Sequence, residues 1–207
     1  MRVLLTGASG ALGTAVIAHF GAQGTEVIGV SRDAHGMLNG DLTKPEDCAR
    51  IAAEAGEVDA VIHAMGAFTM GCDNAAWQYM LNVNLISAFQ IFNAFLPGMK
   101  RRRSGALVAV GTRAAVEPAA GIAAYAASKA ALVHYVRTLA LELRDTGVRA
   151  NIILPSTIDT AANRGAMPDT DFSKWVTPES VAKVLAWLVS EGSCDVSGAM
   201  IPVYGKA

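Results

Sequence analysis

The sequence predicts an α/β protein: a single domain built on a doubly wound parallel sheet of about seven strands with helices on both faces. Short apolar runs alternate with longer segments at helical spacing along the whole chain of 207 residues, with no internal repeat, linker or second domain. Hydrophobic residues make up 52% of the sequence and charged residues 17%, which is typical of helices packed closely on a buried sheet.

Charge and cysteine content exclude several function classes. The net charge is −1, so nothing indicates a nucleic-acid or membrane partner, and the single basic run, 101–103, fits a solvated loop. The three cysteines lack metal-ligand spacing, so we expect no metal site and reduced thiols in a cytoplasmic protein. The chain begins with an apolar strand pattern rather than a secretory signal, and no uninterrupted apolar stretch reaches the roughly 18 to 20 residues of a membrane helix.

The first predicted strand, 3–5, leads through a glycine-rich turn into a helix at 15–20. Glycines in such a turn allow a sharp bend, close approach of the backbone to a pyrophosphate, and tight packing of the helix on the strand. Strand, turn and helix together predict a Rossmann-type dinucleotide site. We expect cofactor contacts here from Gly7, Ser9, Gly10, Leu12 and Gly13.

The end of the second predicted strand, 26–30, bears on the choice of cofactor. An acidic residue there would bind the 2'-hydroxyl of the adenosine ribose, whereas Ser31 and Arg32 offer a hydroxyl and a guanidinium suited to a 2'-phosphate. The sequence therefore favours NADP(H) over NAD(H). The alternative is a shift of register that places Asp33 at the ribose and leaves Arg32 in a surface loop.

The third and fourth strands are predicted at 37–42 and 58–64. Asp41 is either an adenine contact or a turn residue. Gly66 follows the fourth strand at the edge where open parallel sheets bind ligands. His63, near the same edge, is a candidate catalytic base, although a packed core histidine is the favoured interpretation.

The remaining elements are expected as helices at 43–55, 74–96, 120–144 and 177–190 and as strands at 106–110, 148–154 and 200–203. The helix at 74–96 carries five aromatic residues, which predicts burial on two sides and a subunit interface. Asn84 in its middle must find partners, either as a structural bond to backbone or within a polar network. The segment 156–177 is expected to be a substrate loop, with a disordered insertion as the alternative.

Tyr125 and Lys129 lie four residues apart in an alanine-rich helix, so they project from the same face. A cation near a phenol favours the ionised form and lowers the phenol pKa toward neutrality. The pair is therefore suited to proton transfer to or from an oxygen. The alternative is chance spacing, with a packed tyrosine and a solvated lysine.

In this order and spacing the motifs resemble the short-chain dehydrogenase/reductase family along essentially the whole chain. The motifs that carry the resemblance are Thr6-Gly7 with Gly10 and Gly13, Asp41-Leu42, Asn82-Val83-Asn84-Leu85, Tyr125 with Lys129, Pro155 with Thr160, and Ser197-Gly198. The resemblance implies that Tyr125 donates or accepts a proton, that Lys129 lowers its pKa and holds the nicotinamide ribose, and that Asn84 supports a proton-relay water. Thr112 stands where the family normally has serine, and its hydroxyl would bind a substrate oxygen.

The resemblance also implies further cofactor contacts, beyond the glycine turn, from Ser31, Arg32, Asp41, Leu42, Ala64, Gly66, Tyr125, Lys129, Pro155, Thr157 and Thr160. The family's asparagine-asparagine-alanine-glycine motif is replaced here by His63-Ala64-Met65-Gly66. Within the family, the segment 154–175 is similar to the dihydropteridine reductases. Ser31-Arg32, Thr112 and Phe68 depart from that group.

The leading functional hypothesis is an NADPH-dependent reductase of a small carbonyl, a quinone or a quinonoid dihydropterin, with Tyr125 as proton donor. A non-catalytic NADP(H)-binding sensor or scaffold is the alternative, supported by the departures at Thr112 and at 63–65. Glycine spacing like that of nucleotide-sugar epimerases is a third possibility, against which we note the lack of a C-terminal substrate domain. We expect a homodimer or homotetramer through the helices around Phe89 and Tyr135.

Overall fold

The structure is a computed structural model that describes residues 1–32 and 36–206. Its centre is a sheet of six strands, all parallel, in the order β2-β1-β3-β4-β5-β6. The strands are β1 (Arg2–Thr6), β2 (Glu26–Val30), β3 (Ala60–His63), β4 (Gly105–Val110), β5 (Val148–Pro155) and β6 (Met200–Val203). This confirms the predicted fold class. Because the strand order reverses at β1, the carboxyl ends of β1 and β3 flank the crevice where such sheets bind ligands.

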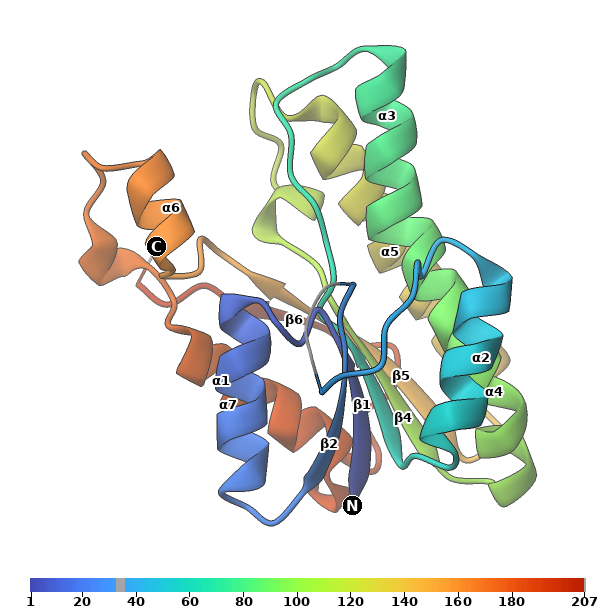
Figure 1. The fold of residues 1–207 in the computed structure, drawn as a ribbon. Helices are drawn as coiled ribbons and strands as arrows, with labels where there is room; N and C mark the ends of the chain where they lie inside the picture. Colours follow the sequence, from blue (N-terminus) through green and yellow to red (C-terminus); the bar gives the residue numbers. More distant parts are fainter. Residues whose placement is uncertain (33–35, 207) are drawn as a thin grey trace.

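Helices cover both faces of the sheet (Figure 1). One face carries α1 (Ala11–Gly21) and α7 (Pro178–Val189), and the other carries α2 (Pro45–Ala55), α4 (Ser87–Arg102) and α5 (Ala123–Glu142). Successive strand residues alternate between the faces, so Leu4 joins one buried cluster and Leu5 the other. The two apolar layers bury both faces of the sheet, so its carboxyl edge is left to build a site.

The predicted third strand at 37–42 does not form, so the sheet has six strands rather than about seven. Leu38 makes a single parallel bridge to Val30. The chain then leaves the sheet because the Asp41 carboxylate accepts hydrogen bonds from the backbone N–H and the hydroxyl of Thr43, at 3.0 and 2.7 Å. Asp41 is thus a turn residue, as the alternative interpretation had it.

The helix predicted at 74–96 is longer and is interrupted by a change of register. It comprises α3 (Asn74–Leu81), a π-helical turn (Asn82–Ile86) and α4, which continues to Arg102. Taken together, residues 74–102 are the one helical stretch of the described chain that is long and apolar enough to cross a membrane. The sequence had predicted no stretch of that kind. Its inner side chains, including Phe92 and Met99, are buried against the sheet, and a core helix passes the same test.

Candidate active site

The turn after β1 requires glycine at two positions. Gly7 has a φ of +69°, and a Cβ built on it would lie 2.9 Å from the carbonyl carbon of Ala64. A Cβ on Gly13 would lie 2.6 Å from the carbonyl oxygen of Ala8, inside the contact between turn and helix. The first glycine therefore allows the bend, and the second lets α1 approach the strand.

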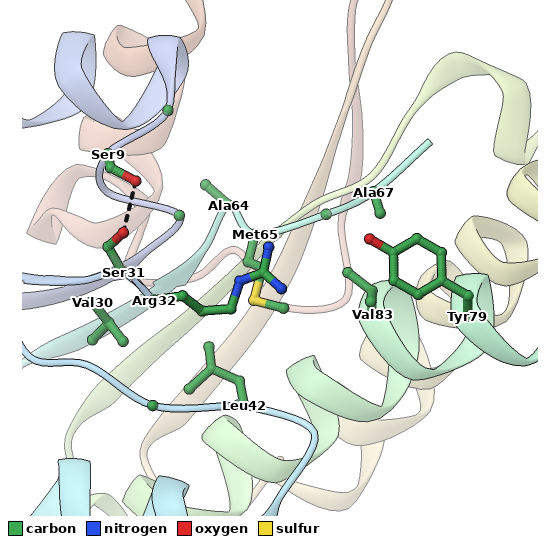
Figure 2. Close-up of a pocket in the computed structure, with 14 residues that line it drawn as sticks. Ser9, Val30, Ser31, Arg32, Leu42, Ala64, Met65, Ala67, Tyr79 and Val83 are labelled. Atoms are coloured by element: carbon green, nitrogen blue, oxygen red, sulfur yellow. Dashed lines mark hydrogen bonds between the residues drawn. The ribbon is translucent and has the colours of Figure 1, made fainter. Parts of the chain in front are cut away.

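A cavity of about 260 Å³ opens beside this turn (Figure 2). At one end the hydroxyls of Ser9 and Ser31 are 2.8 Å apart, and the Arg32 side chain extends into the middle. Glycine backbone and the Ser9 hydroxyl at the start of α1, with the Ser31 hydroxyl and the Arg32 guanidinium after β2, fit the phosphate and ribose groups of a dinucleotide. The predicted residues that line the cavity are Gly7, Ser9, Gly10, Ser31, Arg32, Leu42, Ala64 and Gly66.

Some predicted contacts lie elsewhere. Asp41 closes the turn described above, and Asp33, the rival at the ribose, lies outside the described residues. The predicted contacts that do not line this cavity are Leu12, Gly13, Asp41, Tyr125, Lys129, Pro155, Thr157 and Thr160.

Sequence reasoning missed part of the cavity wall, above all Tyr79 and Val83 from the helix that contains Asn84. Figure 2 shows the Tyr79 hydroxyl pointing toward the cavity. The two side chains are one helical turn apart, and that spacing is the only sequence signal for them. The other missed lining residues are Val30, Gly40, Met65 and Ala67.

Lys129 is buried beside the loop that follows β3. Its ammonium donates a hydrogen bond to the backbone oxygen of Val110 at 3.0 Å, and a Cβ on Gly66 would lie 3.1 Å from Nζ. Burial lowers the pKa of Lys129 to about 8. The glycine at position 66 thus leaves room for the ammonium at the mouth of the crevice.

Tyr125 lies at the start of α5, where it is half-buried beside Phe68 and Thr112. Its ring meets Phe68 edge-on, with ring centroids 5.0 Å apart. Burial raises the pKa of Tyr125, and the neighbouring Thr112 side chain opposes that rise. The expectation that Lys129 lowers this pKa is not met in the chain alone, because the ammonium is directed to the Val110 carbonyl.

Asn84 is fully buried in the π-helical turn, and its amide both bonds to backbone and belongs to a polar network, so both interpretations hold. Its Oδ1 accepts from the N–H of Ala67 at 2.9 Å, and its Nδ2 donates to the Ala67 oxygen at 3.1 Å. Nδ2 also donates to the Ser128 hydroxyl at 3.0 Å, which in turn donates to the backbone oxygen of Tyr125. The side chain of Asn84 therefore ties the loop after β3 to the helix that carries Tyr125.

His63 is not available as a catalytic base. It is completely buried, and burial, together with the charge of Lys129, lowers its pKa to about 3. Its ring nitrogens lie 3.0 Å from the Thr6 hydroxyl and 3.1 Å from the Ser87 hydroxyl. The favoured interpretation, a packed core histidine, is confirmed.

The segment 156–177 contains a short helix, α6 (Ala161–Ala166), rather than being irregular throughout. The Thr160 hydroxyl accepts the N–H of Asn163 and caps this helix. Arg164 forms a two-pronged ion pair with Asp159, at 2.6 and 2.7 Å, and its guanidinium lies over the ring of Phe172. These contacts fold the segment on itself. Its role over a substrate stays a prediction.

Comparison with known proteins decides the family. A profile of the short chain dehydrogenase family matches residues 1–171. The chain belongs to the short-chain dehydrogenase/reductase family. It is accordingly an oxidoreductase of the NAD(P)H-dependent type, and the crevice at the carboxyl edge is its candidate active site.

Several members of the short-chain dehydrogenase/reductase family are similar over nearly the whole chain. The 3-oxoacyl-(acyl-carrier-protein) reductase FabG of Escherichia coli K12 is 27% identical over 233 residues, which cover 98% of this chain and 95% of that protein. The reductase MabA of Mycobacterium tuberculosis H37Rv is 31% identical over 225 residues, with coverages of 98% and 91%. A Burkholderia thailandensis oxidoreductase of the family superposes with a TM-score of 0.90 at 30% identity, covering 99% of this chain and 91% of that one.

Proposed function

We propose that this protein is an NADPH-dependent reductase of a small carbonyl compound, with Tyr125 as proton donor. The observation that carries the proposal is the grouping of the Tyr125 and Thr112 side chains with the buried Lys129 ammonium, one helical turn from Tyr125, at the carboxyl edge of the sheet. The bound cofactor would supply a hydride. Thr112 would orient the substrate oxygen and Tyr125 would protonate it as the hydride arrives.

Lys129 and Asn84 would act on the other side of the same crevice. Both approach Gly66, since a Cβ on that glycine would lie 3.1 Å from Nζ and 3.2 Å from Oδ1. A cofactor ribose at the Gly66 backbone would offer its hydroxyls to the Lys129 ammonium. A negative charge developing on Tyr125 would be stabilised if the ammonium turned from the Val110 carbonyl toward the phenol.

The cofactor preference is proposed as NADP(H) over NAD(H). Ser9 and Ser31 supply two hydroxyls at one end of the cavity, where the ribose would lie, and the Arg32 guanidinium extends into its middle. An Arg32→Ala variant should raise the KM for NADPH at least about tenfold and leave the KM for NADH nearly unchanged, since one charged hydrogen bond to a phosphate is lost. An equal effect on both cofactors would contradict the preference.

The substrate is proposed to carry an apolar body next to its carbonyl. Phe68 and Met70 are 59% and 69% exposed, and Phe68 meets the ring of Tyr125. The names of FabG and MabA point to 3-oxoacyl thioesters, which combine a carbonyl with an alkyl chain. Quinones and quinonoid dihydropterins rank behind them, because the relatives named above are 3-oxoacyl reductases rather than dihydropteridine reductases.

The test compares NADPH and NADH oxidation with short 3-oxoacyl thioesters, quinones, aldehydes and quinonoid dihydropterin. We expect turnover with NADPH and a 3-oxoacyl thioester, and a loss of at least about a hundredfold in kcat for Tyr125→Phe, the scale of a general acid. Tyr135→Phe, the same exchange farther along α5, serves as the matched control for folding. Unchanged turnover by Tyr125→Phe with every accepted substrate would refute the mechanism.

A non-catalytic sensor or scaffold remains the second candidate, because His63 to Met65 depart from the family pattern. NADPH binding with no oxidation of any substrate in the panel would favour it. We give it the lower rank because a sensor has no need for the grouping of Tyr125, Thr112 and Lys129.

We further propose a cytoplasmic homodimer or homotetramer assembled through α4 and α5. Phe89 is 40% exposed and meets the ring of Tyr135, with centroids 5.9 Å apart. A Phe89→Arg variant should therefore sediment as a smaller species than the wild type. A wild-type monomer at micromolar concentration would contradict the assembly.

A further inference from the structure

A chain of hydrogen bonds crosses the core beneath the candidate active site. His63 stands at its centre, at the carboxyl end of β3, where it is completely buried and meets Phe92 edge-on. Thr6, the last residue of β1, lies on one side of the ring, and Ser87, the first residue of α4, lies on the other. The His63 side chain thus connects the end of β1 to the start of α4.

The neighbouring donors give this chain a direction. The N–H of Met65 donates to the Thr6 hydroxyl oxygen at 3.3 Å, so the hydroxyl proton of Thr6 is free to point to Nδ1. The Ser87 hydroxyl donates to the backbone oxygen of Val83 at 2.6 Å, so its oxygen accepts from Nε2. The network is therefore satisfied by a neutral His63 that carries its proton on Nε2.

The Ser87 end of the network stabilises the π-helical turn. In an α-helix the N–H of Ser87 would donate to Val83, but here it donates to the backbone oxygen of Asn82. The Val83 oxygen accepts the Ser87 hydroxyl in its place. Because this turn carries Asn84 inward to the Ala67 backbone, the Ser87 hydroxyl supports the position of the Asn84 side chain.

The Thr6 end of the network holds the loop after β3. Thr6 accepts from Met65, and Asn84 pairs with both backbone groups of Ala67, so the loop 64–67 is held at two points. This loop lines the cavity assigned to the cofactor, and its Gly66 faces the Lys129 ammonium. The two ends of the hydrogen-bond chain therefore meet again in a single short loop.

We propose that His63 is a positioning residue that holds the loop 64–67 and the π-helical turn in register, so that Asn84 and Gly66 are set against Lys129 for cofactor binding. The inference rests on the proposed function only for the choice of NADPH as the cofactor whose affinity is measured. It assigns a purpose to the departure at His63, where the residue bonds to Thr6 and to Ser87 at once, one on each side of β3.

The first test observes the wild-type chain. Histidine-selective ¹⁵N NMR should show the His63 ring protonated on Nε2 alone and unchanged between about pH 5 and pH 9, where an exposed imidazole titrates. The Met65 and Ala67 amides should be protected from hydrogen exchange. A proton on Nδ1, or an imidazolium at pH 6, would overturn the proposal.

The second test uses variants of the full chain. His63→Phe, Ser87→Ala and Thr6→Val should each raise the Kd for NADPH about tenfold, roughly the effect of one lost buried hydrogen bond, and should expose the Met65 or Ala67 amide to exchange. Thr6→Ser, which keeps the hydroxyl, should restore the wild-type Kd. His19→Phe, the same exchange on the last turn of α1, is the control and should leave the Kd unchanged.

The outcomes separate this inference from the proposed function. If the wild type oxidises no NADPH with any substrate, the reductase proposal fails, while NADPH affinity, the tautomer and amide protection still decide the role of His63. If His63→Phe does not fold, Ser87→Ala and the Thr6 pair decide it. Lower melting temperatures with unchanged NADPH affinity and unchanged loop protection would mean a role in stability alone and would overturn the proposal.

Discussion

The buried ammonium of Lys129 makes a quantitative prediction about stability and pH. Folding lowers its pKa from 10.5 to about 8 because the charged form loses its hydration. Below pH 8 the lysine is charged in both states, and the folded state bears the whole cost of burying that charge. Between pH 8 and pH 10.5 the unfolded chain binds more protons than the folded chain, so this residue's contribution to stability rises with pH.

The perturbation is Lys129→Met, which keeps the length of the side chain and removes the charge. From these pKa values the wild type should gain about 2 kcal/mol of unfolding free energy relative to the variant between pH 7 and pH 9.5. That corresponds to a rise of roughly 4 to 8 °C in melting temperature relative to the variant for a chain of this size. The Val110 carbonyl loses its donor in the variant, but that cost is the same at every pH and leaves the slope unchanged.

The assay is urea unfolding of both proteins, without cofactor and at one protein concentration, at several pH values from 7 to 9.5. Lys183→Met, on the exposed face of α7, is the matched control, and its difference from the wild type should stay flat over the same range. A flat difference for Lys129→Met as well would refute the description of Lys129 as a buried ammonium with a lowered pKa.

Three further outcomes follow from the site. Gly13→Ala should weaken cofactor binding at least about tenfold and lower the melting temperature, because its Cβ would lie 2.6 Å from the Ala8 oxygen; wild-type binding measured by fluorescence titration would contradict the packing argument. Asn84→Ala should lose about 2 to 4 kcal/mol in urea unfolding, since three hydrogen bonds of a fully buried amide disappear, and a loss below about 1 kcal/mol would count against the network. Arg164→Ala should speed proteolytic cleavage within 156–177 with little change in global stability, because its ion pair with Asp159 is partly exposed; an unchanged cleavage rate would show that this ion pair does not order the segment.

Much of the fold follows from local patterns. The glycine turn predicted strand, bend and helix because Gly7 must adopt a positive φ and Gly13 must admit a close backbone contact, and both requirements are visible in the residue type. The buried strands could be predicted because a parallel strand covered on both faces is a nearly continuous run of β-branched and apolar residues. The strand predicted at 37–42 was wrong because the turn chemistry of Asp41 and Thr43 outweighs a weak apolar pattern.

The candidate site was predicted less completely. Helical spacing placed Tyr125 and Lys129 on one face, but where the ammonium points depends on the Val110 carbonyl at the end of β4, nineteen residues away. The π-helical turn was not anticipated, because it depends on a hydroxyl of α4 and a histidine of β3 that meet only after the sheet has formed. Tyr79 was missed for the same reason, since the other walls of the cavity that it lines come from loops far away in sequence, at 7–10, 31–32 and 64–67.

The sequence alone determined the doubly wound class, the dinucleotide turn and the family motif of Tyr125 and Lys129, because each depends on residues close together in the chain or on residue types with narrow conformational ranges. The tertiary structure alone decided that the sheet has six strands, that His63 is a neutral histidine bonded to Thr6 and Ser87, and that the Lys129 ammonium is directed to the Val110 carbonyl rather than to Tyr125. Those features arise from burial and from hydrogen bonds between residues far apart in sequence. Their free energies depend on which polar groups are buried together and hydrogen-bonded to each other, and a local sequence pattern does not contain that information.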